Sequence, residues 1–190
     1  MLRTFALFLA GTLIAAAAPR AGAAQDPAGV WIELALAPGW ARVACDICDA
    51  GRATGIAGHL ALGGQIGRRV RLGAEMDVWT SGADGVPERV ISLGVVGHWR
   101  PAPARPLRLR AGLAYVTYRV DDNVDVVSAS GIGPLFGAAY DWPVSDRVRL
   151  GPYATLVIGT VGGQVSFNGA RVQDAANVSL LHLGIAATWR

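Results

Sequence analysis

The chain has 190 residues, of which 52% are hydrophobic and 25 are glycine. Its 17 cationic residues are all arginine, against 14 Asp and Glu, and no arginine cluster is interleaved with aromatic residues as in nucleic-acid-binding proteins. The formal net charge of +3 is therefore no sign of a nucleic-acid partner. The length favours a single domain.

The first 24 residues have the three parts of a secretory signal peptide. Arg3 supplies the positive charge, Phe5 to Ala18 form an apolar stretch of 14 residues, and Ala21-Gly22-Ala23-Ala24 offers small residues for cleavage. Fourteen residues are fewer than the roughly 20 that a membrane-spanning helix needs. We therefore expect residues 1–24 to be cleaved and residues 25–190 to form one exported domain.

Eight segments of the exported chain, each about 10 to 14 residues long, alternate between apolar residues and polar or small ones. This period of two predicts β-strands with two different faces. In residues 70–79, for example, Leu72 and Met76 share one face, while Arg71 and Glu75 share the other. The eight segments are residues 31–40, 54–64, 69–79, 89–99, 107–120, 131–142, 147–160 and 178–190.

The two faces predict a transmembrane barrel rather than a soluble, lipocalin-like one. One face is almost free of charge, as a lipid-facing surface must be, because a charge at the bilayer midplane costs about 2 to 4 kcal/mol. The other face combines charges with Gly and Ala, which suits a narrow interior. Closure of such strands leaves no unpaired edge in the bilayer. We predict an all-β fold, an eight-stranded antiparallel up-and-down transmembrane β-barrel preceded by a cleaved signal peptide.

The connections between the segments alternate in length, as they do between the periplasmic and outer ends of such barrels. Both termini are then expected at the periplasmic end. The short connections are residues 65–68, 100–106 and 143–146, and the long ones are residues 41–53, 80–88, 121–130 and 161–177. Tryptophan at segment ends predicts aromatic girdles at the two membrane interfaces. The girdle residues are Trp31, Trp40, Trp79, Trp99, Trp142 and Trp189.

With its signal, its alternating segments and connections and its terminal strand LLHLGIAATWR, the chain resembles the small outer-membrane β-barrel proteins, namely the OmpA-like transmembrane domain and its OmpW-like and porin-like relatives. The resemblance covers the whole exported chain. It implies an integral protein of the bacterial outer membrane, in contact with outer-membrane lipid and lipopolysaccharide. The terminal strand of this family usually ends on an aromatic residue read by the barrel-insertion machinery, whereas here Arg190 follows Trp189.

The charged face is expected to form a salt-bridge network in the interior, because an unpaired buried charge is costly. A polar pore lining is the alternative, although eight strands leave an interior that side chains just fill. The three histidines share this face at apparently different depths without a clustered carboxylate, so no metal or cofactor site is predicted. The expected interior residues are Glu33, His59, Arg71, Glu75, Asp77, Arg108, Arg110, Arg149 and His182, together with His98.

No catalytic residues are predicted, although some outer-membrane barrels are lipid-modifying enzymes or proteases. Ser179 and His182 would lie on opposite faces of a strand, where a nucleophile and its base cannot meet. The leading interpretation is a non-enzymatic outer-membrane protein with a structural or surface-interaction role. A narrow porin-like channel for small solutes is the second interpretation, and a lipid-modifying enzyme is the third.

Both cysteines, Cys45 and Cys48, fall in the first long connection of an exported chain, where paired thiols tend to be oxidised. The setting lacks the βαβ pattern of a thioredoxin-like motif, and the connection has no histidine for a zinc site. A local disulfide is the leading interpretation, with zinc, free thiols and a bond to a partner as alternatives. Residues 120–125 (VDDNVD) predict a solvated acidic loop, with a divalent cation site as the alternative.

Overall fold

The computed structural model describes residues 29–44, 51–82, 85–102, 104–122, 124–173 and 176–190. The expected signal peptide and the Cys45–Cys48 disulfide lie outside the described residues and stay predictions. No helix in the described part of the chain is long and apolar enough to cross a membrane. The strands are β1 (Val30–Ala44), β2 (Ala53–Gln65), β3 (Val70–Ser81), β4 (Glu88–Trp99), β5 (Leu107–Asp121), β6 (Val126–Tyr140), β7 (Trp142–Pro143), β8 (Val148–Gly159), β9 (Val161–Phe167), β10 (Ala170–Gln173) and β11 (Asn177–Trp189).

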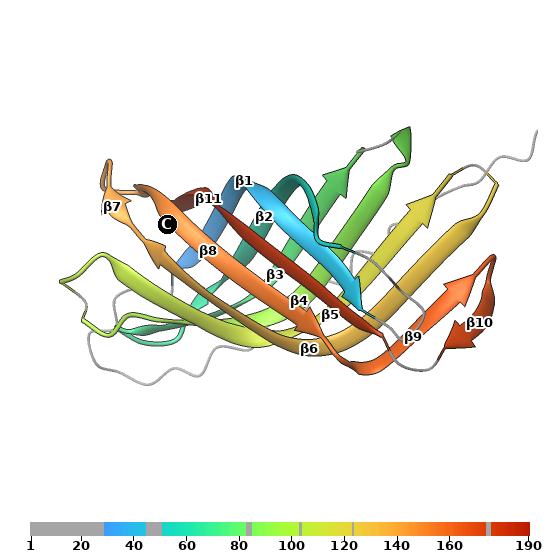
Figure 1. Ribbon diagram of the computed structural model, residues 1–190. Coiled ribbons are helices and arrows are strands. Elements are labelled where there is room, and N and C mark those ends of the chain that lie inside the picture. The colour runs from blue at the N-terminus through green and yellow to red at the C-terminus, as the bar shows by residue number, and fades with distance from the viewer. Residues whose placement is uncertain (1–28, 45–50, 83–84, 103, 123, 174–175) are drawn as a thin grey trace, which may run out of the picture.

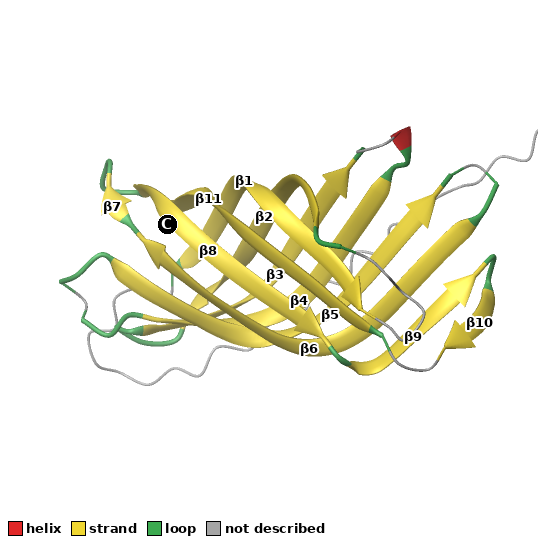
Figure 2. Ribbon diagram, in the orientation of Figure 1, coloured by secondary structure: helices red, strands yellow, loops and turns green. Residues whose placement is uncertain are grey.

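Eight of these strands close into one antiparallel barrel (Figure 1), and Figure 2 shows that strands make up nearly all of it. Neighbours in the sequence pair from β1 to β6, then β6 pairs with β8, β8 with β11, and β11 with β1. The closing ladder runs from Ile32 opposite Trp189 to Ala44 opposite Asn177. The predicted fold class is therefore confirmed.

The two ends of the barrel carry different connections (Figure 1). The turn end holds the β2–β3, β4–β5 and β6–β8 connections and the C-terminus, whereas the loop end carries the β9–β10 hairpin. β9 pairs with the part of β6 that precedes residue 133. Residues 161–177, expected as a loop, thus include a hairpin, and β6 begins at Val126 instead of residue 131. These stretches are short and rich in Gly and Ser, so they lack the apolar alternation on which the prediction depended.

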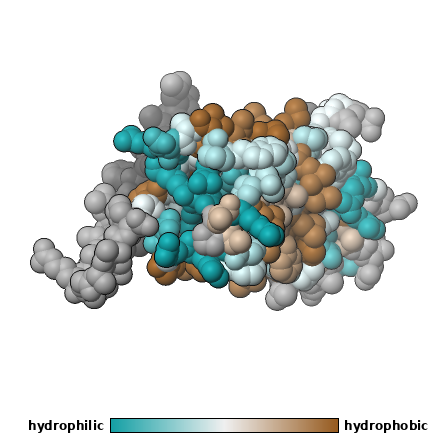
Figure 3. All heavy atoms as spheres, turned by 90° about the vertical axis from the view of Figure 1, so that its left-hand side faces the viewer, coloured by the Kyte–Doolittle hydropathy of each residue, from teal (hydrophilic) through white to brown (hydrophobic). Residues whose placement is uncertain are grey.

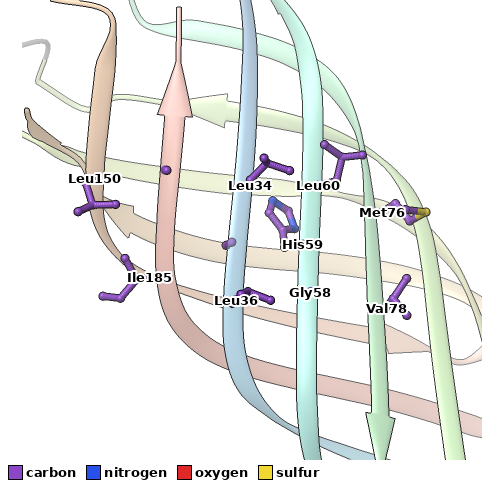
Figure 4. A pocket seen from close by; sticks show the side chains of 11 residues that line it. Leu34, Leu36, Gly58, His59, Leu60, Met76, Val78, Leu150 and Ile185 are labelled. Atoms are coloured by element: carbon purple, nitrogen blue, oxygen red, sulfur yellow. The ribbon is translucent and has the colours of Figure 1, made fainter. Parts of the chain in front are cut away.

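Outward side chains give the barrel an apolar surface. Leu34 and Leu36 of β1 are 48% and 72% exposed, whereas Glu33 between Ile32 and Leu34 is fully buried. A shallow apolar groove of about 550 Å³ lies where Gly58 leaves room beside these leucines and Met76 (Figure 4). On a transmembrane barrel such a surface faces lipid hydrocarbon, so we assign the groove to the lipid-facing surface.

The interior of the barrel is built in two layers. Toward the turn end most of the inward side chains are charged or polar, and we call this the polar layer. Toward the loop end they form an apolar layer, which fills the interior as expected for eight strands. Its largest members are fully buried and pack in one cluster: Trp79, Val90, Val116, Leu135, Val157 and Leu180.

Two tryptophans expected in the girdles lie inside the barrel, so the girdle prediction is wrong for them. The fully buried ring of Trp79 lies against Gly39 and Gly55, where a Cβ atom would come within 2.8 Å of ring atoms. Its indole N–H donates to the Gly39 carbonyl at 3.0 Å. Trp31, only 1% exposed, packs against His98 with ring centroids 4.6 Å apart and the rings tilted by 37°. A tryptophan at an inward-facing strand position therefore points into the barrel even near the strand end, because glycines opposite it leave room for the ring.

The other four tryptophans point outward from the barrel wall. Trp99, Trp142 and Trp189 are between 40% and 52% exposed at the turn end, and Trp40 is half-buried on the outer face of β1. These residues keep the parity that an interfacial girdle needs. The girdle stays a prediction for them.

We expect Trp79→Ala to lower the free energy of unfolding by about 3–5 kcal/mol, because it leaves a cavity in the apolar layer. Trp142→Ala is the matched control, since that ring is 52% exposed and its loss creates no cavity. Urea unfolding in lipid vesicles gives the free energies, and the temperature at which the barrel loses its fast mobility in SDS gives the rank order. Equal losses in the two variants would contradict an interior Trp79.

Candidate functional site

The polar layer brings together most of the residues that the sequence assigned to the interior. Five strands that are remote in sequence supply them: β1, β2, β3, β5 and β11. Each side chain reaches the interior because inward positions alternate along its strand. The buried residues of this set are Glu33, His59, Glu75, Asp77, Arg108, Arg110 and His182.

Arg108 of β5 lies at the centre of the polar layer, between two carboxylates. Its Nη1 and Nη2 donate to the two carboxylate oxygens of Glu33, and its Nε and Nη2 donate to Asp141 at 3.0 Å each. Thr188 of β11 also donates to Glu33, at 2.7 Å. Arg100 donates to Asp141 at 2.8 Å. Such two-pronged, charge-assisted contacts are the strong kind of hydrogen bond, so this group ties β1, β5 and β11 together across the interior.

Asp141 lies between β6 and β7 and is 3% exposed. Burial alone would raise the pKa of its carboxyl group, but the charge and hydrogen bonds of Arg108, with help from Arg100, hold the pKa below its usual range. Asp141 is therefore an ionised partner for both arginines at neutral pH.

A second group joins two histidines through one carboxylate. His59 Nδ1 lies 2.7 Å from Asp77 Oδ1, and Arg110 Nη1 lies 3.2 Å from His59 Nε2. Because an ionised carboxylate can only accept, Nδ1 donates to Asp77. Nε2 also lies 3.4 Å from Glu33 Oε1, so it has both a guanidinium and a carboxylate as neighbours. His182 Nε2 lies 3.2 Å from the same Asp77 oxygen, and its Nδ1 lies 2.9 Å from the Tyr153 hydroxyl.

The expectation that the three histidines lie at different depths is wrong for His59 and His182, whose ring centroids are 6.2 Å apart. Depth in a barrel depends on strand tilt and stagger, which counting residues from segment ends does not reveal. His98 does lie apart from this pair, against Trp31 and Arg108.

Glu75 stands beside the histidine group without a hydrogen bond. Both of its carboxylate oxygens are buried and unpartnered in the described structure, and the closest cation is Arg110, with Nη1 3.7 Å from Oε2. The ligand atoms of His59, Glu75 and Asp77 all lie within 4.8 Å of one another. Imidazole nitrogen and carboxylate oxygen atoms are ligands that suit a divalent transition metal. Alternatively, a proton on Glu75 would remove its unpaired charge without a metal.

Two arginines assigned to the network do not join it. Arg71 is 5% exposed and its Nη1 has no hydrogen-bond partner among the described residues. Arg149 is half-buried at the start of β8 and makes no salt bridge in the part of the chain that the structure describes. Both lie near the turn end, whereas the carboxylates Glu75 and Asp77 lie deeper along β3.

Several members of the polar layer were not predicted, and four of them make hydrogen bonds in it: Arg100, Asp141, Tyr153 and Thr188. Arg100 and Asp141 continue the inward parity of β4 and β6, but each lies just past or close to the end of its segment, where it was assigned to a turn or left without a role. Tyr153 and Thr188 share the inward parity of Arg149 and His182. Parity alone would have found all four. The prediction considered charged residues within the segments, so it missed the uncharged Tyr153 and Thr188 and the two residues at segment ends, Arg100 and Asp141.

No protein-family model and no curated protein matches the sequence. Solved structures match the fold. Neisserial surface protein A superposes with a TM-score of 0.57 at 16% identity, covering 84% of this chain and 96% of that one. Ail, the attachment invasion locus protein of Yersinia pestis, in complex with the heparin analogue sucrose octasulfate, gives 0.51 at 10% identity, covering 84% and 97%.

The class is therefore that of these small barrels. By its fold and its apolar outer surface, the chain is an integral eight-stranded β-barrel of the bacterial outer-membrane type. Identities this low carry the architecture alone, so the site has to be interpreted from its own side chains.

We expect Glu33→Gln and Glu75→Gln to differ sharply. Glu33→Gln leaves Arg108 and Arg110 short of a buried counter-charge and should cost about 3–5 kcal/mol of unfolding free energy. Glu75→Gln removes a buried carboxylate that has no hydrogen bond, so stability should be unchanged or higher. Urea unfolding in lipid vesicles measures both. A larger loss of unfolding free energy for Glu75→Gln than for Glu33→Gln would contradict the central role given to the Arg108–Glu33 contact.

Proposed function

We propose that the chain is a closed, non-conducting and non-enzymatic outer-membrane barrel whose loop end contacts the surroundings of the cell. The filled interior carries this proposal. The apolar layer around Trp79 and Leu180 obstructs the loop half, and the hydrogen-bonded group around Arg108 occupies the turn half. An interior packed at both levels disfavours a solute channel, because eight strands leave no width beyond their own side chains.

The loop end supports a surface role because hydrogen bonds join the turn before β6 to the β9–β10 hairpin, and together they project from the barrel. Asp122 Oδ1 accepts from the backbone N–H groups of Asp125 and Val124, at 2.6 and 3.0 Å, and these bonds lower the pKa of the Asp122 carboxyl group. Asn168, in the β9–β10 turn, donates to Asp125 at 2.8 Å and accepts from the N–H of Val126 at 2.8 Å. The acidic turn and the hairpin thus hold each other in place.

An enzymatic role has little support from the described side chains. Ser179 and His182 lie on opposite faces of β11. The histidine group, which contacts the Tyr153 hydroxyl, lies buried in the polar layer. Outer-membrane lipid and lipopolysaccharide would surround the apolar surface, and β11 would be the strand read by the barrel-insertion machinery.

Planar-bilayer recording tests the closed interior. The purified barrel should give no discrete conductance steps, because charges and apolar side chains fill its axis. A general porin in the same bilayers is the positive control. Steady single-channel steps from the wild type would overturn the proposal in favour of a narrow channel, and an altered lipid A or phospholipid profile on overexpression would favour a lipid-modifying enzyme.

Cysteine labelling of intact cells tests which end faces outward. In a background with Cys45 and Cys48 changed to serine, Val172→Cys in β10 should react with a membrane-impermeant maleimide, since its side chain is 49% exposed at the loop end. Val144→Cys, between β7 and β8 and 66% exposed, is the control and should react only after the outer membrane is permeabilised. The reverse labelling would place the hairpin in the periplasm and remove the surface role.

A further inference from the structure

The turn end of the barrel holds a small polar cavity crowded with arginine. Figure 3 views this end and shows hydrophilic residues gathered there beside hydrophobic ones. The cavity measures about 40 Å³, room for about three water-sized groups at roughly 10–15 Å³ each. Among the described residues, no acidic side chain lines it. The arginines that line it are Arg68, Arg69, Arg71, Arg100, Arg108 and Arg190.

The cavity is built by the barrel frame rather than by loose surface side chains. Arg71 opposes His98 in the β3–β4 ladder. The backbone N–H of Arg100 donates to the Arg69 carbonyl at 2.9 Å, and that of Arg190 donates to the Arg147 carbonyl at 3.0 Å. The guanidinium groups are therefore delivered to the cavity from strand ends in a fixed register.

Arg71 is the side chain that this cavity leaves without a partner. Arg71 is only 5% exposed, and its Nη1 atom has no hydrogen-bond partner in the described structure. Arg100 has a similarly orphaned Nε, although its Nη2 is bonded to Asp141. Burying an ionised group without a counter-charge is strongly unfavourable. An anion in this polar cavity would supply the partner that both donors lack.

The unpaired charge cannot be removed by a proton. Buried Glu75 can be neutralised by protonation, whereas arginine keeps its charge at neutral pH. The pKa of Arg190, at the cavity mouth, is lowered to about 10 by burial and by the nearby Arg100 and Arg149. This shift indicates a positive potential at the mouth. The charge of Asp141 acts on Arg71, but its carboxylate oxygens are already hydrogen-bonded to Arg100 and Arg108.

We propose that the turn-end cavity binds a phosphate group, with Arg71 as its central ligand and Arg100 and Arg190 completing the cradle. Guanidinium groups bind phosphate oxygens through paired, charge-assisted hydrogen bonds. With the orientation expected for the barrel, the site opens to the periplasmic side. There the phosphate is either a free anion or the headgroup of a phospholipid in the inner leaflet.

Calorimetric titration of the purified barrel with inorganic phosphate, in a phosphate-free maltoside detergent, tests the site. Phosphate should bind to the wild type with one-to-one stoichiometry and at least about tenfold more weakly to Arg71→Gln, because the variant loses a charge-assisted pair of hydrogen bonds. Arg42→Gln, an exposed arginine on the outer face of β1, is the matched control and should bind like the wild type. Chloride at equal ionic strength should not compete.

Native mass spectrometry of the same variants with phosphatidylglycerol distinguishes the two sources. Lipid retained by the wild type and Arg42→Gln but lost by Arg71→Gln identifies a headgroup site. Phosphate binding without lipid retention identifies a free anion. Binding of neither ligand to the wild type, or equal binding by Arg71→Gln, overturns the proposal.

The test does not depend on Arg71 alone. Arg71→Gln should fold, because it removes an unpaired buried charge, and in phosphate-free buffer its heat-induced mobility shift should occur at the wild-type temperature or above. If that variant fails to fold, Arg190→Gln at the exposed mouth serves instead. Phosphate should then raise the unfolding temperature of the wild type more than that of Arg190→Gln, and equal rises would contradict the site.

Discussion

The contact on which the polar half of the barrel depends is the insertion of Arg108 between Glu33 and Asp141. These three residues come from β5, from β1 and from the junction after β6, and their sequence separations are 75 and 33 residues. A guanidinium in a narrow interior has to meet carboxylates in a fixed geometry. These contacts form only when the three remote segments are in the correct register. They therefore specify the strand pairing more tightly than backbone hydrogen bonds alone would, because a slipped ladder could form similar backbone bonds.

The apolar layer divides the interior and sets what the barrel can do. Trp79 crosses over Gly39 and Gly55, and the valines of β4, β5 and β8 fill the space around it. Among the described residues, apolar side chains of this layer lie between the charged groups and the loop end. The histidine group is itself almost fully buried, so its contacts with Asp77 act in a low dielectric, where they are stronger than in water.

Much of the fold was predictable because it rests on parity. The alternation that separates Leu34 from Glu33 also separates lipid from interior, and it places all eight barrel strands. The two failed tryptophans show where two signals conflict: Trp79 has inward parity and a position near a strand end, and the glycines that admit its ring lie on β1 and β2, remote in sequence. The approach of His59 to His182 was hidden for a related reason, since barrel stagger is a property of the closed sheet and not of any one segment.

β3 also explains why the interior is left with charges that do not cancel. Arg71 and Glu75 share its inward face, yet four residues of strand separate their Cα atoms by roughly 13 Å at 3.3 Å per residue. Arg71 therefore lies at the mouth beside other arginines, while Glu75 lies deeper beside Arg110. A strand spaces its inward charges too far apart to pair with each other, so each must find a partner from across the barrel. Arg108 has two carboxylate partners and Asp77 has two histidine partners, whereas Arg71 has no hydrogen-bonded carboxylate among the described residues and lies beside other arginines. The turn end is therefore the part of the barrel with the largest excess of positive charge.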